Sequence, residues 1–160
     1  MDLEKLKKNV TARGMEFFYA RSAEEARQHV LEQVQNTTVG SGGSKTVDAL
    51  NLYDELCKTN EVHWHWKDGA KPEVYRAAEQ AEVYLSSVNG ISETGELVNI
   101  DGRGNRVAAL TYVMGKRVFL LASMAIFAAS FRSVLTRFVF VIAIVVGARI
   151  LQSTACSVSW

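Results

Sequence analysis

The chain has 160 residues, of which 48% are hydrophobic and 22% are charged, as in an ordinary globular domain. One proline and eleven glycines exclude a collagen-like or low-complexity chain. The net charge of +1 lacks the basic excess of a dedicated nucleic-acid-binding protein, so we expect no nucleic-acid partner. Two distant cysteines, Cys57 and Cys156, form no metal-binding or disulfide framework, which predicts reduced thiols and a cytoplasmic location.

Charge is distributed unevenly along the chain. Residues 1–101 hold all 17 acidic residues and 11 Lys and Arg residues, a net charge of −6, whereas residues 102–160 hold seven Lys and Arg residues and no acid. The apolar stretches between the arginines of this second part are 14 and 11 residues long, and a membrane-spanning helix needs about 20. We therefore expect this part to contribute buried core and not to bind a membrane.

Helix and strand patterns alternate through residue 88. Apolar spacings of three and four predict helices, and short apolar or β-branched runs predict strands. The predicted elements, in chain order, are helix 2–13, strand 15–20, helix 22–34, strand 37–39, helix 46–58, strand 62–66, helix 72–80 and strand 81–88. This alternation predicts an α/β fold with a mostly parallel sheet flanked by helices.

The alternation is interrupted after residue 88. Glu93-Thr94-Gly95-Glu96 is a turn signal between residues 87–89 and 97–100, which predicts an inserted β-hairpin. A helix over 105–110 and a buried strand over 117–122 follow.

The first candidate binding site is a glycine-rich loop between a predicted strand and a predicted helix. Its members are Gly40, Ser41, Gly42, Gly43 and Ser44. Backbone N–H groups at such a junction suit an anion. Lys45 and Thr46 suggest a P-loop, but Val39 and Ser44 occupy positions where that motif needs glycine. The alternative interpretation is a tight strand-to-helix turn without a ligand.

A second glycine-rich turn follows the predicted hairpin. It contains Asp101, Gly104, Asn105 and Arg106. Asn105 can cap the next helix, and the Arg106 guanidinium can bind a carboxylate or phosphate through two N–H groups. The alternative is a capped turn with a solvated arginine.

Other polar residues give weaker signals. Glu93 and Glu96 flank the tip of the predicted hairpin, and paired carboxylates can act as acid, base or nucleophile where burial perturbs them. His63 and His65 share one face of a predicted strand, but no third ligand has metal-site spacing. We expect these two histidines and His29 to be structural or exposed, and we expect no metal site.

Three blocks of the sequence resemble the lactate-utilisation (LUD) domain family in order and spacing. The blocks are residues 38–44 (TVGSGGS), 87–97 (SVNGISETGEL) and 101–110 (DGRGNRVAAL). The family's usual alanine after Asn89 is Gly90 here, and its usual threonine between the two glycines of the last block is Arg103. Both differences are mild, and the resemblance covers residues 1–124.

The resemblance implies a fold similar to the sugar-phosphate isomerase and CoA-transferase group, and a cytoplasmic protein linked to the oxidation of L-lactate to pyruvate. Family members of that pathway are thought to act with iron–sulfur partner proteins. An iron–sulfur cluster is therefore expected only in partner subunits, and no cofactor is evident in this chain. The family supplies no settled catalytic residue.

The sequence departs from the family pattern after Met124. Residues 125–147 are acid-free and rich in β-branched residues, and the family's expected proline and cysteine-rich segments are absent. We therefore divide the chain into a LUD-like α/β domain over 1–124 and a divergent apolar segment of the same domain over 125–160. A change of reading frame is our hypothesis for this segment, and a helix over 125–137 would lack the charged outer face of a surface helix.

Two functions follow from the sequence. The first is an α/β protein of lactate utilisation that binds a small carboxylate or phosphate-bearing ligand, with Glu93 as the residue to test for catalysis. The second is a non-catalytic interaction subunit of an iron–sulfur lactate-oxidising complex. Whether the chain is an enzyme, and its oligomeric state, stay open between them. The predicted ligand-binding residues are Gly40, Ser41, Gly42, Gly43, Ser44, Asn89, Thr94, Gly95, Asp101, Gly104, Asn105 and Arg106.

Overall fold

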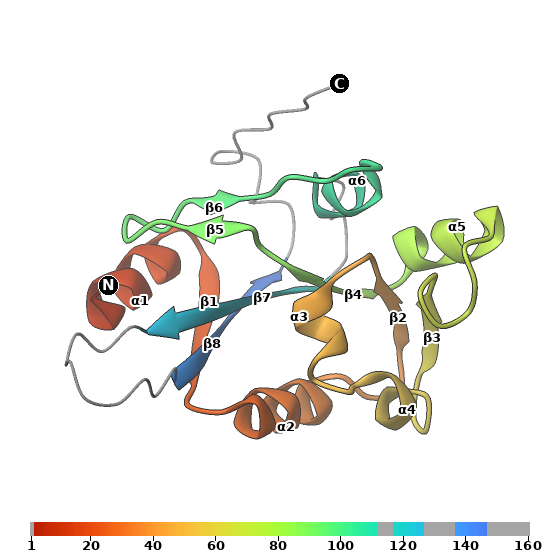
Figure 1. Cartoon of the computed structure of the whole chain (residues 1–160), viewed down its shortest axis with the longest axis horizontal. Coiled ribbons are helices and arrows are strands. Elements are labelled where there is room, and N and C mark those ends of the chain that lie inside the picture. Colours follow the sequence, from red (N-terminus) through yellow and green to blue (C-terminus); the bar gives the residue numbers. More distant parts are fainter. Residues whose placement is uncertain (1, 112–116, 127–136, 147–160) are drawn as a thin grey trace.

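Strand and helix alternate along most of the chain in a computed structural model, which describes residues 2–111, 117–126 and 137–146 (Figure 1). The helices are α1 Leu3–Ala12, α2 Ala23–Gln33, α3 Lys45–Asp48, α4 Tyr53–Leu56, α5 Pro72–Gln80 and α6 Asn105–Thr111. The strands are β1 Met15–Ala20, β2 Thr38–Ser41, β3 Glu61–Trp64, β4 Val83–Ser87, β5 Gly90–Ile91, β6 Leu97–Val98, β7 Arg117–Ile126 and β8 Arg137–Val146.

Six strands form one sheet in the order β1-β8-β7-β4-β2-β3. The neighbours from β7 to β3 are parallel, whereas β8 is antiparallel to both β7 and β1. Strands β5 and β6 pair separately as an antiparallel hairpin. The predicted α/β class, with a mostly parallel sheet, flanking helices and an inserted hairpin, is confirmed.

Local capping explains where the first helices begin. The Asp2 carboxylate accepts hydrogen bonds from the amides of Glu4 and Lys5. The Ser22 hydroxyl accepts from the Glu25 amide at 3.1 Å, as the capping-box spacing predicts. These side chains satisfy amide groups that have no partner within the helix.

The predicted helix over 46–58 is wrong in one respect, because the structure divides it into α3 and α4. Asn51, between them, has a φ of 49°, which continues no right-handed helix. Leu50 and Leu52 are both buried, at 2% and 0% exposure. Residues two apart point to different sides of a helix, so the chain breaks and both leucines reach the core.

Helices cover both faces of the sheet. One core contains residues of α2, α3 and α4 with Val83 and Leu85 of β4. The other contains residues of α1, α5 and α6, together with Tyr84 of β4 and Leu97 of the hairpin. Alternate residues of β4 therefore enter opposite cores, as the side-chain alternation of a strand requires.

Gly40 allows α5 to pack directly against the sheet. A Cβ atom at Gly40 would lie 2.0 Å from the carbonyl oxygen of Ala78 in α5. Only a residue without a side chain fits this contact.

Two long strands come from the acid-free part of the chain. β7 extends from the predicted strand into residues 125–126, and β8 lies between β1 and β7. An almost uninterrupted apolar sequence, such as that of residues 138–146, is typical of a strand covered on both faces. The suggested helix over 125–137 is wrong at both ends, because residues 125–126 belong to β7 and Arg137 begins β8. Residues 127–136 lie outside the described residues. The division at residue 124 and the frame-change hypothesis stay predictions.

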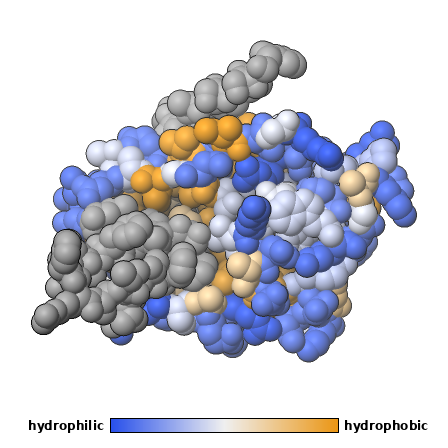
Figure 2. Space-filling view, in the orientation of Figure 1, coloured by the Kyte–Doolittle hydropathy of each residue, from blue (hydrophilic) through white to orange (hydrophobic). Residues whose placement is uncertain are grey.

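The surface seen in Figure 2 is mainly hydrophilic, with an apolar patch over the β5–β6 hairpin and the segment that follows it. Val98 and Ile100, with 43% and 51% exposure, belong to this region. Within the described part of the chain, none of the helices has the length and apolar character that crossing a membrane would require.

Candidate functional site

The connections of the parallel strands identify one edge of the sheet as the expected binding edge. From β2 the chain continues to β3 on one side and then to β4 on the other. The carboxyl ends of β2 and β4 therefore flank the point where the strand order reverses. In open α/β sheets, ligands bind in the crevice at this point.

A cavity of about 470 Å³ lies at this edge. Its walls come from the segments that follow β2 and β3 and from the glycine-rich turn before α6. The lining residues are Gly43, His65, Trp66, Ala70, Asp101, Gly102, Arg103, Asn105 and Arg106. Four predicted binding residues thus meet in one cavity: Gly43, Asp101, Asn105 and Arg106.

The first glycine-rich loop packs directly against the second. A Cβ atom at Gly42 would lie 2.3 Å from Cγ of Arg106 and 2.7 Å from the Tyr84 hydroxyl. The Ser44 hydroxyl donates to the hydroxyl of Ser87, at the end of β4, over 2.9 Å. The same Ser44 oxygen accepts from the Val47 amide and caps α3. Gly42 and Ser44 therefore hold the loop against its neighbours.

Two further residues of the first loop lie behind the cavity. Ser41 is buried, and its hydroxyl donates to the Leu85 carbonyl over 3.1 Å. Gly40 faces α5, as described above. These contacts position the loop within the sheet.

Arg106 connects the segments around the cavity. Its side chain is 11% exposed. Nη1 donates to the Ser87 carbonyl over 3.3 Å, and Nη2 donates to the Ile100 carbonyl over 2.7 Å. Nε lies 3.9 Å from an Asp101 carboxylate oxygen. Arg106 therefore joins the end of β4 to the end of the hairpin.

Asp101 caps the start of α6. One carboxylate oxygen accepts from the amides of Arg106 and Val107 over 2.6 and 3.3 Å. Asn105, the predicted cap, is the first residue of the helix. Gly104 has a φ of +79°, a conformation that favours glycine.

Arg103 and His65 form a polar side of the cavity. Arg103 is exposed, and its Nη1 donates to the Tyr75 hydroxyl over 2.7 Å. The Tyr75 ring stacks on His65 with centroids 4.6 Å apart. Burial, and next the charge of Arg103, lower the pKa of His65 below its ordinary value of 6.5. The imidazole is therefore neutral at pH 7.

Trp66 forms an aromatic wall. It is 46% exposed, and its ring stacks on the buried Trp64 with centroids 6.1 Å apart and planes inclined by 21°. A Cβ atom at Gly43 would lie 3.0 Å from the indole. The indole thus lies against the Gly43 backbone on the cavity's side of the first loop.

The tip of the hairpin lies against α1 and does not line this cavity. Backbone carbonyls of Glu93 and Thr94 accept from Asn9 and Arg13. Gly95, with a φ of +86°, is also packed against α1. At the base of the hairpin, the Asn89 side chain accepts from the Ile100 amide. The structure therefore separates the predicted residues Thr94 and Gly95 from the cavity.

Glu93, the predicted catalytic residue, contacts the start of α1. Its carboxylate accepts from the Asp2 amide over 3.1 Å and pairs with Lys5 over 3.2 Å. The Asp2 amide and then Lys5 lower the pKa of Glu93. Glu96 pairs with Arg13, and hydroxyls of Ser92 and Thr94 lower its pKa to about 2. The catalytic role of Glu93 stays a prediction.

The sequence reasoning did not identify His65, Trp66 and Arg103 as site residues. β3 ends at Trp64, two residues before the predicted strand end, so His65 and Trp66 follow the strand. Residues that follow a parallel strand lie at the binding edge of the sheet, and this rule could have identified them. Among the described residues, no cluster of three His, Cys, Asp or Glu side chains could hold a metal ion.

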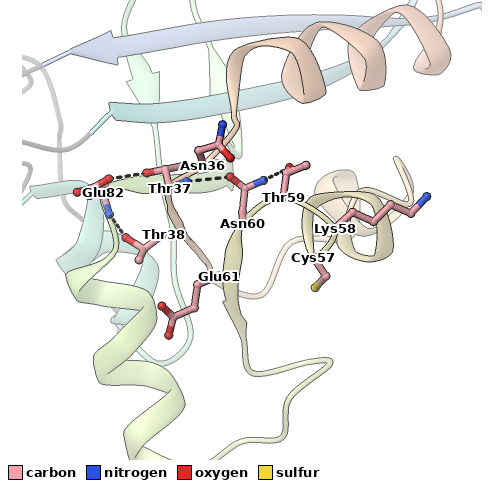
Figure 3. Close-up of a pocket in the computed structure, with 9 residues that line it drawn as sticks. All are labelled: Asn36, Thr37, Thr38, Cys57, Lys58, Thr59, Asn60, Glu61 and Glu82. Carbon is pink, nitrogen blue, oxygen red and sulfur yellow. Dashed lines mark hydrogen bonds between the residues drawn. The ribbon is translucent and has the colours of Figure 1, made fainter.

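A second hollow, of about 640 Å³, lies at the opposite edge of the sheet (Figure 3). Its polar side chains bond to one another and to nearby backbone: Thr37 donates to Glu82, and the Asn60 carbonyl oxygen accepts from the Thr37 amide. The exposed Cys57 lies at its rim, and partial desolvation of the thiol raises its pKa. These bonds connect the amino ends of strands, which is a structural role.

Comparison with known proteins identifies the family. The LUD domain matches residues 3–156, which is nearly the whole chain. The chain therefore belongs to the LUD domain family, the family of lactate-utilisation proteins. No curated protein and no solved structure matches it.

Proposed function

We propose that this protein binds a small 2-hydroxy or 2-oxo carboxylate, such as L-lactate or pyruvate, in the cavity at the carboxyl edge of the sheet. The proposal assigns it to the oxidation of L-lactate to pyruvate. The main supporting observation is that the two glycine-rich blocks of the LUD sequence meet in this cavity, beside Arg103 and His65.

In this proposal Arg103 supplies the counter-charge for the carboxylate. Its guanidinium carries five N–H donors, and the described hydrogen bond to Tyr75 uses one of them. Arg106 acts differently, because two of its nitrogens already donate to the Ser87 and Ile100 carbonyls. Arg106 is therefore a positioning residue that sets the shape of the cavity, next to the Arg103 that contacts the ligand.

His65 is suited to hold the 2-hydroxyl group of lactate. The His65 ring makes a hydrogen bond with the Ser41 backbone. A neutral imidazole has one donor nitrogen and one acceptor nitrogen. In the forward direction this nitrogen would accept the hydroxyl proton. Oxidation of lactate to pyruvate also breaks the C2–H bond, which releases a second proton and two electrons. We propose that this proton leaves to solvent and that iron–sulfur partner proteins accept the electrons.

A second candidate function is that of a non-catalytic subunit of the same complex. The exposed Val98 and Ile100 on the hairpin favour it, because exposed apolar patches mark protein interaction sites. For both functions we propose the cytoplasm, since the exposed free thiol of Cys57 suits a reducing compartment. A pull-down combined with calorimetry separates the two functions: lactate binding by the purified chain alone supports the first, and lactate binding only together with a captured partner supports the second.

Titration calorimetry of the full chain with L-lactate, pyruvate and lactamide tests the proposed ligand. Lactamide matches lactate in shape but carries no charge, so we expect it to bind at least tenfold more weakly. We expect Arg103→Gln to weaken lactate binding at least tenfold, about 1.4 kcal/mol. Arg76→Gln is the matched control, because Arg76 is an exposed arginine of α5 that does not line the cavity. Equal binding of lactate and lactamide, or equal effects of the two substitutions, would contradict the proposal.

A further inference from the structure

The cavity is larger than a small carboxylate requires. L-Lactate has only six non-hydrogen atoms, whereas cavities of about 300–1,000 Å³ are typical of sites for drug-sized ligands. The cavity has about 470 Å³. Its size is therefore that of a site for an organic ligand larger than lactate.

One wall of the cavity is aromatic and is formed by Trp66. Trp66 is one of three exposed large hydrophobic residues among those whose side chains the structure describes. It lines the cavity described above. The indole is held from behind by the buried Trp64 and from the side by the Gly43 backbone. A tryptophan fixed in this way is a prepared stacking surface, because little side-chain freedom remains to be lost on binding.

Charge accompanies the aromatic wall. Arg103 and Arg106 line the cavity beside Trp66, with Asp101 as the acidic lining residue. Asp101 is already engaged with the amides at the start of α6. His65 continues the aromatic side, because its ring lies 6.1 Å from Trp66 and stacks on Tyr75. The cavity therefore combines a flat apolar surface with exposed positive charge at Arg103.

We propose that the cavity binds a mononucleotide, with its aromatic ring stacked on Trp66 and its phosphate at Arg103. Stacking on an aromatic side chain is tolerant of base identity, since every base presents a π-face. Arginine recognises phosphate through parallel N–H groups. This inference rests on the cavity that the proposed function uses. Because both ligands pair with Arg103, the nucleotide and the carboxylate occupy the cavity in turn and not together.

The full-length protein is titrated with three probes: AMP, ribose 5-phosphate and adenosine. We expect AMP to bind at least tenfold more tightly than either of the other two, because ribose 5-phosphate lacks the ring and adenosine lacks the phosphate. AMP binding no tighter than that of ribose 5-phosphate would overturn the ring site. This comparison uses the unaltered protein, so it remains decisive if a variant fails to fold.

Two substitutions of Trp66 then separate stacking from apolar contact. Trp66→Leu keeps an apolar side chain but removes the π-face, and we expect it to weaken AMP binding at least tenfold while leaving ribose 5-phosphate unchanged. Trp66→Phe keeps a ring and should recover most of the AMP affinity. Equal AMP affinity in Trp66→Leu and the parent would overturn the proposal.

L-Lactate titration of the same proteins distinguishes this inference from the proposed function. AMP binding without lactate binding supports the ring site and contradicts the lactate role. Lactate binding, with AMP no tighter than ribose 5-phosphate, contradicts the ring site alone.

Discussion

Replacing Arg106 with alanine tests whether this residue primarily supports the fold. The guanidinium donates to the Ser87 and Ile100 carbonyls and lies 3.9 Å from Asp101, in a side chain only 11% exposed. Hydrogen bonds with a charged partner contribute about 1.5–3 kcal/mol each. Removing one member of a buried charged pair costs about 3–5 kcal/mol. We therefore expect Arg106→Ala to lower the free energy of unfolding by about 3–5 kcal/mol.

Arg106→Met is the matched control for packing. Methionine keeps the Cγ methylene that lies against Gly42, and a buried methylene contributes about 0.8 kcal/mol. We expect the free energy of unfolding of Arg106→Met to be about 1 kcal/mol higher than that of Arg106→Ala, so most of the stability loss relative to the parent protein remains. Urea unfolding followed by circular dichroism gives both values. A loss below about 1 kcal/mol in Arg106→Ala, with carboxylate binding weakened tenfold in the folded protein, would refute the positioning role and favour direct contact with the ligand.

Three further results are expected. Gly40→Ala should lower the free energy of unfolding by at least about 2 kcal/mol in chemical denaturation, because its Cβ would overlap the backbone of α5. Gly102→Ala should change it by no more than about 0.5 kcal/mol, because a Cβ at Gly102 has nothing within 4 Å. Similar losses in both variants would contradict the packing argument. The pKa of His65 is lowered in the folded protein, so the unfolded chain binds more protons than the folded one as the pH falls through 6.5, and stability decreases there. Thermal unfolding at several pH values should show a smaller decrease for His65→Gln than for the parent protein. Parallel curves for the two proteins would contradict this role of His65. Glu93→Gln removes the pair with Lys5 and should speed hydrogen exchange in the first turn of α1; lost turnover with unchanged exchange would instead support the predicted catalytic role.

The sequence predicted the elements of the fold because their signals are local. The capping residues Asp2 and Ser22 and the turn at Gly95 act on neighbours only a few positions away. The break at Asn51 was missed because it depends on two leucines reaching a core built by distant strands. Tertiary packing decided that element, against the helical pattern of the segment.

The site was predictable in part for the same reason. Gly43 follows the parallel strand β2, and Arg106 lies in the connection between the parallel strands β4 and β7. Both therefore lie at the edge that the carboxyl ends of such strands share. The position of Glu93 depends on contacts with Asp2 and Lys5, about 90 residues earlier in the chain. No motif within the Glu-Thr-Gly turn carries information about that partner. Trp66 was missed because the predicted strand 62–66 extends two residues beyond the end of β3, so Trp66 was taken as part of the strand and not of the loop that follows it.

Asp101 determines how the second glycine-rich turn can bind a ligand. In sequence, that turn suggests a helix capped by Asn105, but in the structure the Asp101 carboxylate accepts the amides of Arg106 and Val107. A carboxylate at this position satisfies amides that an external anion would otherwise bind. The counter-charge for a ligand must therefore come from a side chain, and Arg103 is the exposed cation of this turn.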